Sequence, residues 1–465
     1  MSHCKSVTSA VAKVACMSTE WDVTQPHCAY ETDNIISGTV FFVQGSDIGL
    51  PDHAAVGITN FHVIEDCRRT SCRVYLSDGT HHDCDVMVAS PQLDFALLKV
   101  DFVPPGICTL APGPHPAPGT PMMITGYPLD TTCDSCQFSY GHMSAPIGGH
   151  WLQCSLSANH GNSGGPLIEI STGFVHGICT ASPCMSEGIT LALPFWAVRV
   201  SLERWRNDTD TLLRLPTVER QIDKFTSTEA SIRNVPHCGV LIGREGPACL
   251  LNALRPGDVL CALDNMEICA LTQRLKTNRA GDVDLDSPVL SLLLPERFTA
   301  QVRRVGVDGV VNVHIKQRAV RTASIRELYP MWENVPIAYI GGSVCLPFCK
   351  NVLDGFDGFD ESERLRQCWN TWDTRTQYPR GRVVIVHVQG HTHADDVGIE
   401  PLMQLKSING TPIDTISDVQ QALEKVSGSR NNTPVKLQFD NRTITMLAKD
   451  ICADAALMSE PMSCQ

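Results

Sequence analysis

The sequence lacks the long apolar runs and the basic clusters that would point to a membrane or to nucleic acid. No stretch of the 465 residues approaches the roughly 18 consecutive apolar positions that a membrane-spanning helix needs. The formal net charge is −13, and no segment is rich in lysine and arginine. We therefore expect no membrane span and no nucleic-acid partner.

The first residues also lack the features of a secretory signal. Met1–Met17 has no long apolar core and no cleavage site of small residues. This segment contains serines and lysines but few acids, so an organelle transit peptide is one interpretation. Apolar and polar residues alternate over Val7–Ala15, which favours a first β-strand of a barrel instead. We expect an intracellular, reducing compartment, the cytoplasm or the nucleus, because no signal is evident and thiols are abundant.

Cysteine is abundant and odd in number, with 21 residues. Several cysteines lie inside apolar strands, which predicts reduced thiols that act as small core hydrophobes. These are Cys154, Cys179, Cys261 and Cys345.

Cys133-Asp134-Ser135-Cys136 could instead be half of a zinc site or a redox pair. A zinc site needs a second ligand pair. The spacing candidates are Cys67/Cys72, Cys179/Cys184 and Cys345/Cys349. We predict no metal and no cofactor, and a metal or redox protein remains the weakest alternative.

The first half of the chain has the pattern of an all-β fold. From Ile36 to about Trp205, short apolar strands alternate with turn residues, which is typical of a pair of barrels. The proline-rich segment Pro104–Pro121 is a plausible crossing between them. Phe195–Trp205 has helical spacing and closes the domain. The predicted strands are Gly38–Val43, Ala55–Val63, Cys72–Leu76, Phe95–Val100 and Pro121–Tyr127.

A serine between glycines is the most specific motif. In Gly161-Asn162-Ser163-Gly164-Gly165-Pro166-Leu167 the glycines allow a sharp turn that aims backbone N–H groups at one point. That arrangement suits a nucleophilic serine with an oxyanion hole formed by the N–H groups of Gly161 and Ser163. A glycine-rich surface turn is the alternative.

Two further segments supply a base and an acid. His62 ends an apolar run, Gly57–Ile64, and Asp94 opens another, Leu93–Val100. The chain order His62, Asp94, Ser163 is that of chymotrypsin-like double barrels. His62 would take the proton of Ser163, and the carboxylate of Asp94 would fix its tautomer.

Other residues compete for these two roles. The rival histidines lie in polar or Gly/Pro-flanked segments, and only Asp94 among the acids opens an uninterrupted apolar run. The rivals are His53, His81, His82 and His160, together with Asp83, Asp85 and Asp101.

The second half contains an internal repeat. Pro256–Ile268 and Pro401–Ile413 align at a constant offset of 145 (401 minus 256). In each copy a strand leads into a tight two-residue turn, Asp264-Asn265 or Asn409-Gly410. A helix capped by Thr415 follows the second copy, with a buried stripe. The stripe is Ile416, Val419, Leu423 and Val426, and the first copy's counterpart begins at Leu271.

Together these segments resemble the HtrA/Deg serine proteases with two PDZ domains, and most closely their plant-type Deg branch. The matching segments are Thr59–Ile64, Leu93–Val100, Gly161–Leu167, Pro256–Asn265 and Leu402–Ile413. Ile340–Pro347 resembles the segment that opens the second PDZ domain of the family, and Arg442–Leu447 the segment that closes it. A short helix such as Asp450–Met458 follows. The resemblance implies a mainly β chain: a chymotrypsin-like double β-barrel protease domain followed by two PDZ-like α+β domains. The expected domains are 1–210 for the protease, 217–322 and 335–449 for the PDZ-like modules, and 450–465 for a tail with a short helix.

The resemblance also implies site residues. His62, Asp94 and Ser163 match the family's triad, and Gly161 and Ser163 its oxyanion hole. The family usually has a proline where His160 stands, a departure that bears on the geometry of this loop. Thr190, Leu191 and Ala192 match the strand that lines the specificity pocket. Thr190 replaces a glycine, which favours small or medium apolar side chains at the cleaved position.

In the first module, Gly239, Val240, Leu241 and Ile242 resemble the strand near a peptide groove. PDZ domains bind C-terminal peptides by adding a strand to a sheet edge. Folded spacers without a ligand are the alternative for both modules.

The leading hypothesis is an ATP-independent serine endopeptidase that cleaves unfolded or damaged proteins. The alternative is a peptide-binding chaperone or assembly scaffold whose protease domain rests inactive. The expected partners are unfolded polypeptides, C-terminal peptides at the first module, and copies of the chain in a homotrimer or a higher oligomer.

Overall fold

The computed structural model describes most of the chain in two compact units. The described residues are 7–51, 53–100, 109–128, 135–149, 151–181, 188–206, 210–216, 218, 222–233, 237–243, 250–251, 253–277, 281–317, 327–356, 381–440 and 442–452. Unit 1 comprises Met1–Ser18, Thr32–Gly243 and Cys249–Arg321; unit 2 comprises Thr19–Glu31, Arg244–Ala248 and Thr322–Gln465. Each unit has its own core.

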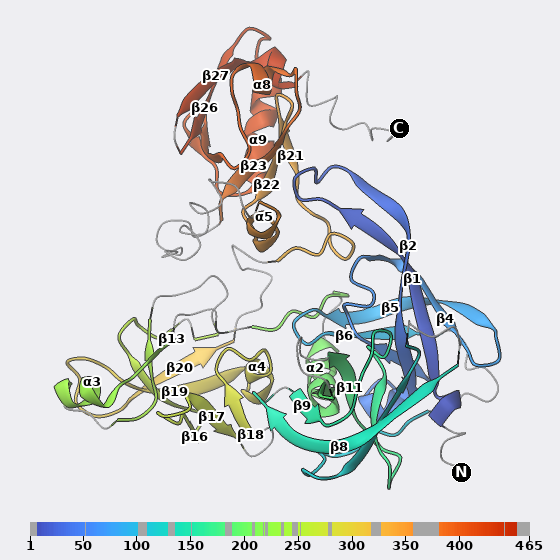
Figure 1. The fold of residues 1–465 in the computed structure, drawn as a ribbon. Coiled ribbons are helices and arrows are strands. Elements are labelled where there is room, and N and C mark those ends of the chain that lie inside the picture. Colours follow the sequence, from blue (N-terminus) through green and yellow to red (C-terminus); the bar gives the residue numbers. More distant parts are fainter. Residues whose placement is uncertain are drawn as a thin grey trace. The chain divides into compact units, whose positions relative to one another are not determined.

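A closed six-stranded barrel opens unit 1 (Figure 1). Its strands follow the order β1-β2-β3-β6-β5-β4, and β1 pairs with β4 to close the ring, with Cys16 opposite Cys72. The strands are β1 (Val11–Trp21), β2 (Ala29–Val43), β3 (Val56–Thr59), β4 (Cys67–Tyr75), β5 (His81–Ser90) and β6 (Phe95–Lys99), with the 3-10 helix η1 (Gly45–Ile48) after β2. Closure leaves no open sheet edge in the barrel.

A second closed barrel follows in the order β10-β11-β12-β9-β8-β7. Helix α2 (Phe195–Trp205) ends this part of the chain and buries Phe195, Val198 and Leu202, as its helical spacing predicts. The strands are β7 (Pro121–Gly126), β8 (Gln137–Ile147), β9 (Trp151–Cys154), β10 (Pro166–Glu169), β11 (Val175–Ala181) and β12 (Thr190–Pro194). The predicted double barrel is confirmed.

The first module adds a sheet of order β13-β14-β15-β19-β20, with β16 paired to β15. Its sheet strands are β13 (Ile222–Lys224), β14 (Val240–Ile242), β15 (Val259–Leu263), β16 (Met266–Glu267), β19 (Arg297–Arg303) and β20 (Val311–Lys316). A separate hairpin consists of β17 (Arg274–Thr277) and β18 (Gly281–Asp284), and the helices are α3 (Ser227–Ile232) and α4 (Leu290–Leu293).

The second module, in unit 2, has a sheet of order β21-β22-β23-β24-β26-β27, with β25 paired to β24. Its strands are β21 (Ala338–Ile340), β22 (Ser343–Pro347), β23 (Val383–Val388), β24 (Gln404–Ile408), β25 (Thr411–Pro412), β26 (Pro434–Phe439) and β27 (Thr443–Leu447). Its helices are α5 (Lys350–Gly355), α8 (His393–Asp396) and α9 (Ile416–Ser427). These β-rich sheets are consistent with the predicted PDZ-like class.

The hairpin turns of the internal repeat are confirmed. Asp264, Asn265, Asn409 and Gly410 all have positive φ, between 44° and 77°, as a tight turn between paired strands requires. Thr415 caps α9 in a reciprocal capping box with Asp418.

From Leu271, where the helix after the first copy is expected, the structure has the hairpin of β17 and β18, and the short helix α4 follows only at Leu290. Leu275 and Val283 lie opposite each other across this hairpin, and both are fully buried. Apolar residues at every second position suit a strand better than a helix. The repeat therefore diverges at this point.

The cysteine predictions fare differently from site to site. Cys154, Cys179 and Cys345 are buried in cores, as predicted, whereas Cys261 is only half-buried. Cys133 lies outside the described residues. Within the described part of the chain no group of three or more His, Cys, Asp or Glu side chains could hold a metal ion. No described helix is both long enough and apolar enough to cross a bilayer.

Candidate active site

His62 lies in a turn, not at the end of a strand. Strand β3 ends at Thr59, and the chain turns through Asn60–Asp66 before β4 begins. Phe61 and Val63 on either side of His62 are 2% exposed. They anchor the turn in the core, and the side chain of His62 stays 44% exposed. The predicted strand Ala55–Val63 was thus too long at its C-terminal end.

The carboxylate of Asp94 meets the imidazole of His62 from the turn before β6. Asp94 has a left-handed φ of 56°, a conformation uncommon outside glycine and asparagine. Its Oδ1 and Oδ2 lie 3.0 Å and 2.8 Å from Nδ1 of His62, and Oδ1 also accepts the backbone N–H of His62 at 2.9 Å. An ionised carboxylate only accepts, so Nδ1 carries the proton and Nε2 is left as an acceptor.

The rival acids have other surroundings. Asp83 pairs with the guanidinium of Arg73 at 2.8 Å, Asp85 is exposed, and Asp101 lies outside the described residues. Among the described acids, Asp94 alone hydrogen-bonds to His62.

The surroundings of His62 raise its pKa above the usual value. Burial by itself lowers the pKa of the imidazole, because it disfavours the charged ring. The hydrogen bond and the negative charge of Asp94, together with the charge of Glu65, outweigh this desolvation. The protonated imidazolium is therefore stabilised, as a base that must take a proton during a reaction requires.

Ser163 lies between β9 and β10, and its turn and the turn of His62 both approach strand β2 at Gly38. A Cβ built on Gly38 of β2 would lie 2.8 Å from the side chain of Val63 and 3.0 Å from the carbonyl oxygen of Ser163. The backbone N–H of Thr39 donates to that same oxygen at 2.8 Å. Because Gly38 has no side chain, the turn that carries His62 and the turn that carries Ser163 can both pack closely against β2. Within the described residues, the hydrogen bonds of His62 run only to Asp94.

Two backbone N–H groups in the turn of Ser163 have no acceptor among the described residues. Asn162, Gly164 and Gly165 donate to Asn159, Cys179 and Asn162, whereas the N–H groups of Gly161 and Ser163 donate to no described residue.

Gly161 is itself buried, and its carbonyl is held by the Thr39 hydroxyl at 2.6 Å. A buried donor without a partner is rare in folded proteins. Here the N–H groups of Gly161 and of the half-buried Ser163 lie in one turn, where an anionic oxygen could accept from both.

The segment expected to line a specificity pocket lies in β12. Thr190 is fully buried, and its hydroxyl donates to the carbonyl of Leu156 at 2.8 Å. Leu191 is half-buried and Ala192 is 1% exposed. The hydroxyl of Thr190 is therefore already paired, and its Cβ and methyl group supply the bulk that a glycine would lack.

Three residues that the sequence analysis did not single out hold the site together. Thr39 donates hydrogen bonds to the carbonyl oxygens of Gly161 and Ser163, from its hydroxyl and its backbone N–H respectively. Asn60 donates to the carbonyl of Asp94 at 2.7 Å and to the hydroxyl of Thr180 at 2.5 Å. Thr180 in turn donates to Oδ2 of Asp94 at 2.7 Å, so the second barrel supports the acid that comes from the first.

A β-bulge directs Thr180 toward Asp94. The pairing of β11 with β12 shifts between Cys179 and Ala181, and Thr180 is the extra residue. A bulge re-aims the side chain that it carries. No local signal in the sequence marks this residue, because a bulge depends on the register of the partner strand.

We expect Thr180→Val to lower kcat about tenfold and to leave KM nearly unchanged. Valine keeps the shape but removes the hydroxyl, which donates to the charged Asp94 and accepts from Asn60. A hydrogen bond to a charged group contributes on the order of 1.5–3 kcal/mol. The hydroxyl positions Asp94, so its loss acts on the chemical step. Steady-state kinetics on a peptide substrate would measure the effect. Thr180→Ser, which keeps the hydroxyl, should stay close to wild type; a wild-type kcat in Thr180→Val would contradict this role.

The residues expected at a peptide groove lie on an interior strand. Strand β14 is paired on one side with β13 and on the other with β15, so Val240, Leu241 and Ile242 offer no free edge. Gly239 has a φ of 71° and lies against the backbone of Leu260. Among the described strands, the open edge on this side of the sheet belongs to β13. That these four residues lie near a peptide groove stays a prediction; the free edge next to them is that of β13.

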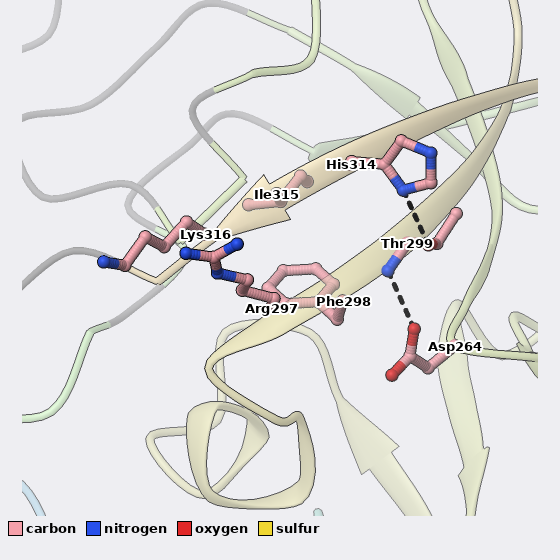
Figure 2. A pocket seen from close by; sticks show the side chains of 7 residues that line it. All are labelled: Asp264, Arg297, Phe298, Thr299, His314, Ile315 and Lys316. Atoms are coloured by element: carbon pink, nitrogen blue, oxygen red, sulfur yellow. Dashed lines mark hydrogen bonds between the residues drawn. The ribbon is translucent and has the colours of Figure 1, made fainter.

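A shallow hollow of about 460 Å³ lies on the first module beside β19 and β20 (Figure 2). Thr299 joins its two walls: the backbone N–H donates to Asp264 at 2.7 Å, and the hydroxyl lies 3.1 Å from Nδ1 of His314. The lining residues are Asp264, Arg297, Phe298, Thr299, His314, Ile315 and Lys316. None of the predicted site residues is among them.

The comparisons with known proteins match the barrel region most clearly. Residues 38–178 match the family model of the trypsin-like peptidase domain. HhoB of Synechocystis sp. is 25% identical over 245 residues, which cover 48% of this chain and 58% of HhoB. The DegP-like periplasmic serine endoprotease of Brucella suis is 30% identical over 239 residues, 48% of this chain and 44% of the relative. The mitochondrial serine protease HTRA2 of Drosophila grimshawi is 24% identical, over 52% and 62%. The chain thus spans about half the length of the curated relatives it matches.

A solved structure supports the fold. A variant of the HtrA-type protease AlgW with a decapeptide is 18% identical, covers 68% of this chain and 97% of its own, and has a TM-score of 0.50. The two closed barrels and the family match agree that residues 38–178 belong to a trypsin-like peptidase domain. The relatives that match about half of this chain are DegP-like and HTRA2 serine proteases.

Proposed function

We propose that this protein is an ATP-independent serine endopeptidase in which Ser163 is the nucleophile, His62 the general base and Asp94 the acid that orients it. Ser163 Oγ would attack the peptide carbonyl while Nε2 of His62 takes its proton. The same nitrogen would then return the proton to the leaving amine. The N–H groups of Gly161 and Ser163 would donate to the oxyanion of the tetrahedral intermediate.

The observation that carries this proposal is the hydrogen bonding around the GNSGGP turn. Both oxygens of Asp94 face Nδ1 of His62, which leaves Nε2 as the acceptor. The N–H groups of Gly161 and Ser163 lack an acceptor within the described chain. A base and an oxyanion hole are two separate requirements of acyl transfer, and the hydrogen bonds of His62 and of the Ser163 turn support one each.

For substrates, we propose unfolded polypeptides cleaved after small or medium apolar residues. The buried Thr190 narrows the strand that would line the pocket, and no acid is available there in the sequence to bind lysine or arginine. For the first module, we propose that C-terminal peptides add to the β13 edge, since β14 is paired on both sides. A homotrimer is proposed from the resemblance to HtrA proteases.

Labelling with a fluorophosphonate tests the mechanism directly, because the probe reacts with a serine only where nucleophile, base and oxyanion hole act together. We expect wild type to be labelled at Ser163 and Ser163→Ala not to be labelled. Ser171→Ala is a matched control, since Ser171 lies on an exposed turn, and it should label as wild type does.

The absence of labelling in folded wild-type protein would contradict the peptidase proposal. It would favour a peptide-binding chaperone with a resting protease domain. Suppression of client aggregation by Ser163→Ala as effectively as by wild type would then support that function.

A further inference from the structure

Two cysteines of the first module lie in direct contact. Sγ of Cys238 is 3.0 Å from Sγ of Cys261. Cys238 lies two residues before the start of β14, and Cys261 lies in the neighbouring strand β15. Both side chains are half-buried, and both thiols are free. A disulfide bond is about 2.05 Å long, so only a short movement separates this contact from a covalent bond.

The backbone around these cysteines is shaped to bring them together. The pairing of β15 with β19 shifts between Leu260 and Ala262, so Cys261 is the extra residue of a β-bulge, which re-aims its side chain. Gly239, next to Cys238, has a left-handed φ of 71°, and a Cβ there would lie 3.0 Å from Cα of Cys261. Without a side chain at Gly239, the two backbones can approach this closely.

The surroundings assign different parts to the two sulfurs. Cys261 packs against a small cluster formed by Phe225, Ala230 and Val259. Burial, together with the neighbouring Cys238, raises the pKa of the Cys261 thiol to about 12, against the opposing charge of Arg303. Cys261 therefore keeps its proton, which suits it to the second step of an oxidation, the attack of a thiol on a sulfenic acid.

We propose that Cys238 and Cys261 form a reversible disulfide when the protein meets a peroxide. The Cys238 thiolate attacks one peroxide oxygen; an S–O bond forms, the O–O bond breaks, and the other oxygen leaves as water after protonation. The sulfur of Cys261 then attacks the resulting sulfenic acid. The S–S bond forms, the S–O bond breaks, and the thiol proton of Cys261 leaves with the hydroxide as a second water. Two thiols are oxidised and one hydrogen peroxide is reduced to two waters.

The Cys238–Cys261 disulfide would link the start of β14 covalently to β15, next to the open edge strand β13. β13 pairs with β14 along Ile222–Lys224, and Nε2 of His237 lies 2.7 Å from the carbonyl of Phe225, which follows β13. Cys238 is the next residue after His237. A covalent bond at Cys238 therefore restrains the segment that links this edge to the rest of the sheet. This modification site is independent of the proposed peptidase chemistry.

The test is peptide mapping of the full-length protein before and after exposure to hydrogen peroxide. Free thiols are alkylated without reduction, and the digest is searched for cross-linked peptides by mass spectrometry. We expect a peptide containing Cys238 joined to one containing Cys261, two hydrogen atoms lighter than the sum of both. Treatment with dithiothreitol should restore the two separate peptides.

Cys238→Ser and Cys261→Ser should each abolish the cross-link. Cys269→Ser is the matched control in the same module and should leave it unchanged. Hydrogen bonds from Thr272 and from the backbone of Leu271 lower the pKa of the Cys269 thiol, so this residue competes for the oxidant. The proposal is overturned if wild-type protein carries single oxidations at Cys269 or Cys238 but no cross-link. It is also overturned if the cross-link persists in Cys261→Ser with another cysteine as partner.

Discussion

Asp94→Asn is expected to lower kcat/KM by about four orders of magnitude while the protein stays folded. Oδ1 of Asp94 accepts the backbone N–H of His62 at 2.9 Å, and the asparagine oxygen will keep that bond. The amide NH2 then takes the place of Oδ2, 2.8 Å from Nδ1 of His62. Because NH2 donates, Nδ1 must become an acceptor, and the proton moves to Nε2. The ring then presents a donor where the Ser163 proton must go.

The pH profile separates this effect from a loss of structure. His62 acts as a base only when it is neutral, and Asp94 raises its pKa. The activity of wild type should therefore fall on acidification at a pH above the usual pKa of histidine, near 6.5. In Asp94→Asn the carboxylate's charge and its hydrogen bond are gone, so the pKa of His62 falls and the acid limb moves to lower pH.

Kinetics across pH, together with circular dichroism, would measure both effects. Asp83→Asn is the matched control, because Asp83 pairs with Arg73 on the surface, and it should change neither rate nor profile. A rate for Asp94→Asn within tenfold of wild type would refute the role given to Asp94.

Gly164→Ala should lower both the stability and the activity of the protein. Gly164 has a φ of 85°, where alanine costs about 1–2 kcal/mol. A Cβ there would also collide with the carbonyl of Thr39 and with the hydroxyl of Thr59, and would lie 3.1 Å from the N–H of Asn60. The packed backbone of Thr39 and Asn60 cannot move aside as a flexible side chain can. We therefore expect the free energy of unfolding to fall by about 3 kcal/mol or more. The displaced turn should also lower kcat by about 100-fold, because it carries the Ser163 N–H.

Gly173→Ala isolates the steric part of this effect. Gly173 has a similar φ of 75°, but a Cβ there would meet nothing within 4 Å. This variant should show only the cost of the left-handed backbone and should keep full activity. Urea denaturation and peptide kinetics on both variants would measure the difference. Equal losses of stability and activity in Gly164→Ala and Gly173→Ala would mean that the close approach of Gly164 to the Thr39 backbone is unimportant.

The sequence by itself determined the features that depend on neighbouring residues in the chain. Alternating apolar residues marked the barrel strands, and helical spacing marked α2 with its bounds. The turn pairs Asp264-Asn265 and Asn409-Gly410 adopt the positive φ that their chemistry favours. The GNSGGP glycines marked the turn at Ser163, because a left-handed backbone leaves little choice of residue.

Tertiary structure alone decided which distant groups meet. The bulge at Thr180 turns its hydroxyl onto Asp94, and the bulge at Cys261 turns its sulfur onto Cys238. Both depend on the register of a partner strand, which a local pattern does not encode. For the same reason, the resemblance that placed Val240–Ile242 near a peptide groove could not tell that β13 pairs along the edge of this strand. Hydrophobic pattern determines which face of a strand is buried; the pairing of strands decides which edge stays open and which side chains touch.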